Sequence, residues 1–179
     1  HNYFGLFMAK LGLFTASPPA LDLPHVAGAL TSAPYIALQP SSSFAHNPPH
    51  GFVQAVVDAL RSLCPGWPVI VVGSPDTPRD LAGVEYRLGV PVDLLHHIRN
   101  AAMVLSPRSA SAHIAAGYRR PACIWLPDDG MDWHLDYPDW PCRKLPFAAG
   151  VERFVDAIKT FARLSWRDNI HVDASEERL

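Results

Sequence analysis

The chain has 179 residues, of which 49% are hydrophobic and only 18% are charged, and its formal net charge is −2. So high a hydrophobic fraction excludes intrinsic disorder, and the near-neutral charge gives no basic footprint for nucleic acid. The three cysteines show no C-x-x-C spacing, which argues against a disulfide framework or a structural zinc site. Cys123 lies in an apolar run, so we expect it to be a buried thiol.

The predicted elements alternate between strands and helices. Unbroken apolar runs predict buried strands, and apolar residues at helical spacing predict helices. In the first half of the chain we expect a helix at 2–12, a proline-rich connector at 17–24, a strand at 35–38, a loop at 41–49, a helix at 52–63 and a strand at 69–72. Two helices should follow, one at 78–88 with Thr77 as its N-cap and a short one capped by Asp93. The rest of the chain should form a strand at 103–105, a helix at 110–118, a strand at 122–126, a loop at 127–146 and a final helix at 151–161.

This alternation predicts an α/β fold, a Rossmann-like parallel sheet with helices on both faces. In such sheets ligands bind beyond the carboxyl ends of the strands. The loops that follow the predicted strands are therefore the candidate ligand sites, at 40–50, 73–77, 106–110 and 127–140.

The strongest candidate is the turn from the strand at 103–105 into the next helix. Ser109 and Ser111 offer hydroxyl donors, Ala110 permits a close approach, and Arg108 carries a planar fork suited to phosphate. His113 could donate to a phosphate or ribose oxygen. The alternatives are an ordinary N-cap for Ser109 and a core-edge histidine bonded to a carbonyl for His113.

Two other loops could contribute to the same site. Ser41, Ser42, Ser43 and His46 follow the first buried strand, where they could bind or neutralise an anion. Gly73 ends the second strand and could line the pocket, although a glycine in such a turn more often serves only a positive φ.

The loop after the fourth strand is rich in acids and aromatic rings. We expect Asp128 and Asp129, nearest the strand end, to accept hydrogen bonds from a ligand, and Trp140 and Asp139 to be structural. The acid spacing matches no calcium loop, so we expect no metal. The sequence also has no G-x-S-x-G, G-x-x-x-x-G-K-[ST] or G-x-G-x-x-G motif, which disfavours hydrolases, P-loop enzymes and standard dinucleotide binders.

Three segments together resemble a known family: 93–106, Ser109-x-x-x-His113-Ile114-Ala115-Ala116, and Arg120-Pro121-Ala122. Their order is similar to that of the heptosyltransferase-like glycosyltransferases. The resemblance implies a GT-B architecture of two Rossmann-like domains, with a nucleotide-sugar donor held mainly by the C-terminal one. It implies that residues 31–168 are this donor-binding domain, that 1–30 are a helix and connector from a missing N-terminal acceptor-binding domain, and that 169–179 are a polar tail.

The activity implied by this resemblance is transfer of a sugar from a nucleotide-diphosphate sugar to an acceptor hydroxyl, with no metal or other cofactor. The catalytic base would come from the missing domain, so no catalytic residue is assigned and the isolated domain is expected to be inactive. We expect no transmembrane segment and a cytoplasmic protein, either free or at the inner membrane face.

The sequence also departs from the family pattern. Arg108 replaces an acid, Ala110 replaces a glycine, and the loop after the first strand lacks the family's lysine, for which Arg108 or His46 could substitute. A non-catalytic Rossmann-like binding or structural module therefore stays open as the alternative.

Overall fold

The computed structural model describes residues 34–42, 47–49, 51–127, 135, 137 and 140–168, with side chains to residue 161. The expected helix at 2–12, the connector at 17–24 and the tail after 168 lie outside these residues.

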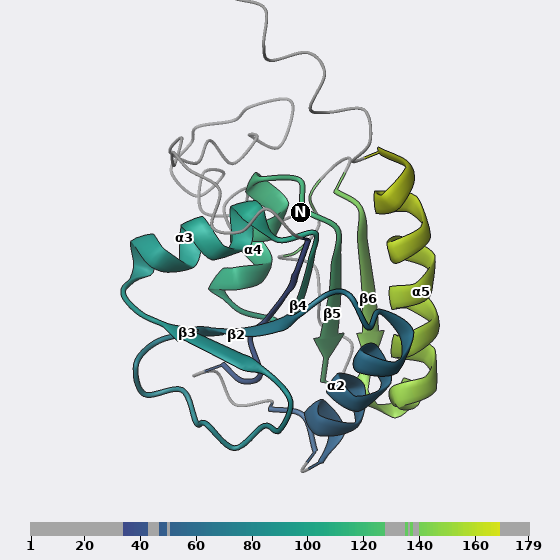
Figure 1. The fold of residues 1–179 in the computed structure, drawn as a ribbon, viewed down its shortest axis with the longest axis horizontal. Helices are drawn as coiled ribbons and strands as arrows, with labels where there is room; N and C mark the ends of the chain where they lie inside the picture. Colours follow the sequence, from purple (N-terminus) through teal and green to yellow (C-terminus); the bar gives the residue numbers. More distant parts are fainter. Residues whose placement is uncertain are drawn as a thin grey trace, which may run out of the picture.

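The described part of the chain contains a six-stranded parallel sheet in the order β3-β2-β1-β4-β5-β6 (Figure 1). Its strands are β1 (Ile36–Leu38), β2 (Val69–Gly73), β3 (Glu85–Leu88), β4 (Met103–Pro107), β5 (Ala122–Leu126) and β6 (Cys142–Pro146). The helical elements are α2 (Phe52–Leu63), α3 (Pro91–Asn100), α4 (Ala110–Gly117), the 3-10 turn η2 (Phe147–Ala149) and α5 (Gly150–Asp168).

Helices cover both faces of the sheet, as the sequence predicts. Along β1, Ile36 and Leu38 join a core with residues of α2 and α5, whereas Ala37 joins a second core with residues of α3 and α4. Side chains alternate between the two faces of a strand, so a continuous apolar run can supply both cores. Figure 1 shows α2 and α5 on one side of the sheet and α3 and α4 on the other.

Aromatic rings fasten the last helix to the sheet. Phe154 of α5 is fully buried, with its ring 5.3 Å from that of Phe52 in α2 and 6.4 Å from that of Trp125 in β5. Both pairs have edge-to-face geometry, which adds about 0.5–1.5 kcal/mol per pair beyond the area that they bury. α5 is therefore an integral layer of this domain.

The strand order reverses between β1 and β4. Leu38 and Leu105 are register partners across this junction. The chain leaves β1 for α2 on one face and leaves β4 for α4 on the opposite face. The carboxyl edge at such a reversal is where open α/β sheets bind ligands.

The predicted helix at 78–88 is wrong. Residues 85–88 form the edge strand β3, paired with β2, and Tyr86 and Leu88 pack against the core. Thr77 is accordingly not an N-cap: its backbone N–H donates to the Ser74 carbonyl oxygen in a turn. Pairing with β2 outweighs the weak helical spacing of this segment.

Two further boundaries differ from expectation. The loop predicted to continue to 146 ends earlier, because Cys142–Pro146 form β6 beside β5. Asp93 does not precede α3 but lies in its first turn, where its carboxylate accepts the N–H of the N-cap residue Val90 at 3.0 Å. The final helix, predicted at 151–161, extends to Asp168 in α5, and the other predicted strands and helices between 35 and 126 are confirmed to within two residues.

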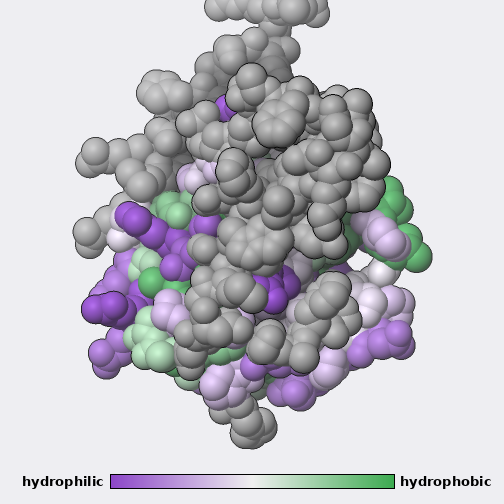
Figure 2. Space-filling view, turned by 180° about the vertical axis from the view of Figure 1, so that it is seen from behind, coloured by the Kyte–Doolittle hydropathy of each residue, from purple (hydrophilic) through white to green (hydrophobic). Residues whose placement is uncertain are grey.

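The coloured surface in Figure 2 mixes hydrophilic areas with small hydrophobic ones. The exposed large apolar residues among those described are Leu63, Val90 and Val92. None of the helices described has both the length and the apolar composition needed to cross a membrane.

Candidate functional site

Side chains join the carboxyl ends of β1 and β4. The Ser109 hydroxyl donates to Gln39 Oε1 at 2.8 Å, and Gln39 Nε2 donates to the Ser41 carbonyl oxygen at 2.9 Å. The backbone N–H of Gln39 also donates to the Leu105 carbonyl oxygen at 2.9 Å. One glutamine therefore ties the loop after β1 to the loop after β4.

A second serine extends this network. Ser106 is completely buried, and its Oγ lies 2.8 Å from Ser109 Oγ and 2.6 Å from the Pro107 carbonyl oxygen. The Ser106 hydroxyl donates to the Pro107 carbonyl oxygen, and the Ser109 hydroxyl donates to Gln39, so the two serine oxygens lie in contact while each serves a further acceptor.

The first turn of α4 begins at the same edge of the sheet. Ser109 is its N-cap residue, and the Ser109 carbonyl oxygen accepts the N–H of Ala112 at 3.1 Å. Among the described residues, however, no hydrogen bond runs from the Ser109 side chain to the helix, since that hydroxyl is turned toward Gln39 and Ser106. The N–H groups and the positive dipole end of α4 are thus left without their usual side-chain cap, an arrangement that suits an anion.

The other predicted residues of this turn lie around it. Ser111 is fully buried, and its hydroxyl has no hydrogen-bond partner among the residues that the structure describes. Ala110 is exposed and Arg108 is partly exposed. The turn therefore combines an accessible small residue, a cation and a hydroxyl whose hydrogen-bonding capacity is unused.

His113 ends this first turn and contacts a residue 24 positions later. Its Nδ1 lies 2.6 Å from the Tyr137 hydroxyl, with the two rings edge to face. Burial lowers the pKa of His113 and raises the pKa of Tyr137. Both side chains are therefore neutral at neutral pH, and the partner of His113 Nδ1 is a side-chain hydroxyl.

A hollow of about 410 Å³ opens beside the loop after β1. Ser41 lines it, and Asn47 Oδ1 accepts the backbone N–H of Ser42 at 3.0 Å, which closes this loop on itself. The first turn of α2 forms one wall and the segment around Asp80 forms another. The structure thus brings Ser41 and Ser42 to the edge that also carries α4.

Gly73 lies at the end of β2, as predicted. A Cβ at this position would approach Thr77 Oγ1 to 2.5 Å, so the glycine permits close packing of the turn that follows. Whether Gly73 also contacts a ligand stays a prediction.

Four predicted residues lie outside those that the structure describes: Ser43, His46, Asp128 and Asp129. Asp139 lies outside them as well. Trp140 is structural, as expected: it is 8% exposed, and its indole N–H donates to the Arg120 carbonyl oxygen at 2.8 Å.

The sequence analysis does not single out three residues that contact Ser109 or His113 in the structure: Gln39, Ser106 and Tyr137. Gln39 is a polar residue directly after a buried strand, a signal that could have identified it. No local pattern indicates the contact of Tyr137 with His113, because only the packing of a distant loop creates it.

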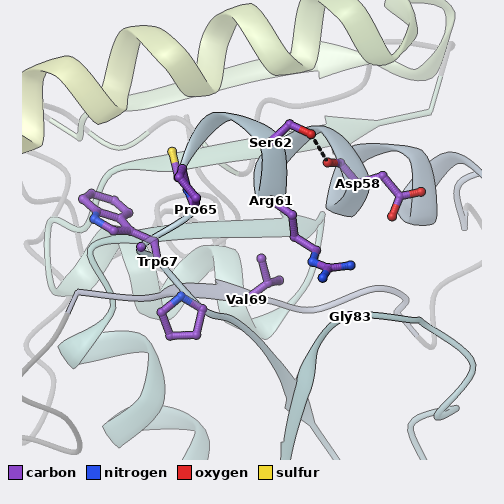
Figure 3. Close-up of a pocket in the computed structure, with 10 residues that line it drawn as sticks. Asp58, Arg61, Ser62, Pro65, Trp67, Val69 and Gly83 are labelled. Atoms are coloured by element: carbon purple, nitrogen blue, oxygen red, sulfur yellow. Dashed lines mark hydrogen bonds between the residues drawn. The ribbon is translucent and has the colours of Figure 1, made fainter.

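A larger hollow, of about 680 Å³, lies at the opposite, amino edge of the sheet, where β2 begins. Figure 3 shows Arg61 reaching from α2 toward Gly83, with Trp67 farther along the hollow. Ser62 donates to the Asp58 carbonyl oxygen of its own helix, at 3.2 Å. We assign the site to the carboxyl edge, where the strand order reverses.

In the described part of the chain, no three histidine, cysteine or acidic side chains gather closely enough to hold a metal ion.

No protein-family model matches the sequence, and no curated protein sequence matches it. Solved structures do match its fold. The E. coli ADP-heptose LPS heptosyltransferase II superimposes with a TM-score of 0.59 at 17% identity, covering 75% of this chain and 48% of that one. The glycosyl transferase family 9 protein of Veillonella parvula gives a TM-score of 0.62 at 10% identity, over 87% and 49% of the two chains.

A third match is the E. coli heptosyltransferase WaaC with ADP, with a TM-score of 0.57 at 14% identity over 76% and 46% of the two chains. The chain has the fold of one half of a heptosyltransferase. It spans about half the length of these structures, and identities this low establish the shared fold alone.

Proposed function

We propose that this chain is the donor-binding domain of a glycosyltransferase that transfers a sugar from a nucleotide-diphosphate sugar to an acceptor hydroxyl. The observation that carries the proposal is the Ser109 hydroxyl, which bonds to Gln39 and Ser106 instead of capping α4. The helix start at the reversal of strand order is thereby left to an anionic ligand.

The diphosphate would lie against the first turn of α4. Backbone N–H groups and the Ser111 hydroxyl would donate to its oxygens, and Arg108 would supply the neutralising charge that the family's lysine supplies elsewhere. Negative charge grows on the diphosphate as the bond to the sugar breaks. Donors that are already oriented stabilise that charge, and this is the catalytic contribution expected of this domain.

The fold comparison supports the same assignment. WaaC, whose matching structure contains ADP, shares the fold over 76% of this chain. The chain corresponds to about half of WaaC, so we propose that a second domain binds the acceptor and provides the base that activates its hydroxyl. On this view the isolated domain binds nucleotide but has no transferase activity.

Titration calorimetry with ADP, UDP, GDP and CDP tests the proposal, with the matching nucleoside monophosphates as controls. We expect saturable binding of at least one diphosphate and weaker binding of its monophosphate. Saturable binding of none of the four would contradict the proposal and favour the non-catalytic module.

The variant Arg108→Ala tests whether Arg108 belongs to the diphosphate-binding site. Loss of a charge-assisted contact to phosphate costs about 1.5–3 kcal/mol, so the diphosphate affinity should fall roughly 10- to 100-fold. Arg153→Ala, which removes an exposed arginine from α5, is the matched control and should bind like the parent. An Arg108→Ala protein with unchanged affinity would remove Arg108 from the site.

A further inference from the structure

The contact between His113 and Tyr137 joins the first turn of α4 to a loop residue. The Nδ1–hydroxyl distance is 2.6 Å. Hydrogen bonds donated by O–H groups are typically 2.5–3.0 Å long, whereas those donated by N–H groups centre on about 2.9–3.0 Å. The short distance therefore favours the phenol as donor and the imidazole nitrogen as acceptor.

Tyr137 is held in place from its other side. Its ring packs edge to face on Trp140, with centroids 5.9 Å apart, and Trp140 is anchored by its bond to the Arg120 carbonyl oxygen. The backbone N–H of Tyr137 donates to the carbonyl oxygen of Leu135, whose side chain is buried. The hydroxyl thus meets His113 from a fixed position.

The protonation states agree with this direction of donation. Burial lowers the pKa of His113, so the ring is neutral at pH 7 and carries one N–H. Burial also raises the pKa of Tyr137, so the phenol keeps its proton. If the phenol donates to Nδ1, the single imidazole proton must reside on Nε2.

We propose that Tyr137 is a positioning residue, which holds His113 in the tautomer protonated at Nε2 and orients that ring as a neutral donor toward the phosphate or ribose oxygens of a bound nucleotide. The part that concerns the nucleotide rests on the proposed function. The part that concerns the tautomer depends only on the contact between the two side chains.

The tautomer is measurable in the full, ligand-free chain by long-range ¹H–¹⁵N NMR of the imidazole nitrogens, with His113→Gln used to assign the signals. In the parent we expect His113 to be protonated at Nε2. In Tyr137→Phe, which keeps the ring but removes the donor, we expect a mixture of both tautomers. We also expect the affinity for ADP, used as the probe, to fall about three- to tenfold.

Tyr35→Phe is the matched control. It removes a phenol that also makes a 2.6 Å hydrogen bond, in this case to the backbone carbonyl oxygen of His97. A general effect of losing a buried phenol would appear in both variants, whereas the proposal expects the His113 tautomer and the ADP affinity to change in Tyr137→Phe only.

Several outcomes would overturn the proposal. If His113 is protonated at Nδ1 in the unsubstituted protein, the proposal is overturned. This measurement needs no variant, so it decides the question even if Tyr137→Phe fails to fold. An unchanged tautomer in Tyr137→Phe would also overturn the proposal, and a changed tautomer with unchanged ADP affinity would remove the role in binding. If the parent binds no nucleotide, the proposed function fails, while the tautomer measurement still decides the positioning role.

Discussion

Ser109 donates a hydrogen bond to Gln39, a residue 70 positions earlier, across the point at which the strand order of the sheet reverses. This bond connects the two loops that follow β1 and β4. It also accounts for the missing side-chain cap of α4, because the Ser109 hydroxyl is turned toward Gln39, whereas a capping serine turns its oxygen toward the helix to accept a backbone N–H.

Removing this bond should destabilise the fold modestly. We expect Ser109→Ala to lower the free energy of unfolding by about 1–2 kcal/mol, since Gln39 then loses a partner in a partly buried position. In a double-mutant cycle with Gln39→Ala, measured by urea denaturation, the coupling should be about 0.5–1.5 kcal/mol. Strict additivity of the two substitutions would show that the contact contributes nothing to stability.

Arg119 adopts a left-handed conformation, with φ 52°, directly after the C-cap of α4. The N–H groups of Arg119 and Arg120 bond to the carbonyl oxygens of Ala116 and Ala115, the pattern of a Schellman motif, whose left-handed position usually holds glycine. We expect Arg119→Gly to raise the free energy of unfolding by about 0.5–1 kcal/mol in urea denaturation.

Arg153→Gly is the control for that prediction. Arg153 is exposed and ends the first turn of α5, where glycine costs up to about 1 kcal/mol. The same substitution should therefore change stability in opposite directions at the two positions. A loss of stability at both would refute the assignment of strain to Arg119.

Stability should depend on the protonation of two partly buried histidines, His113 and His97. Burial lowers the pKa of His113 and of His97 below the ordinary value of 6.5. As the pH falls through 6.5, the unfolded chain binds these protons first, so the free energy of unfolding decreases, and the contribution is fully present only above this pH. Urea denaturation at pH 7.5 and 5.5 measures the difference, which should shrink in His113→Gln. An equal difference in that variant would exclude His113 as a contributor.

The contacts of Phe154 predict a large effect on stability. We expect Phe154→Ala to lower the free energy of unfolding by about 3–5 kcal/mol, because it opens a cavity among the rings that hold α5 against α2 and β5. Val155→Ala, at the half-buried neighbouring position, should cost clearly less. Similar losses for both would mean that α5 is docked by other contacts.

The strands inside the sheet are the elements that the sequence predicts best. β1, β2, β4 and β5 are continuous apolar runs, because helices cover both faces and each strand must bury alternate side chains in two cores. The two edge strands were predicted as a helix and a loop. β3 contains Glu85 and Arg87, and β6 contains Arg143 and Lys144, in keeping with the charged composition that protects exposed edges.

By itself, the sequence determined the fold class, the interior strands and the turn that leads into α4, since these follow from local composition and periodicity. Only the tertiary structure decided which residues meet at the candidate site. The orientation of Ser109 depends on Gln39, and the environment of His113 depends on Tyr137. Such hydrogen bonds join residues far apart in the chain, so their geometry exists only after the sheet has brought β1 beside β4 and Tyr137 has packed against His113.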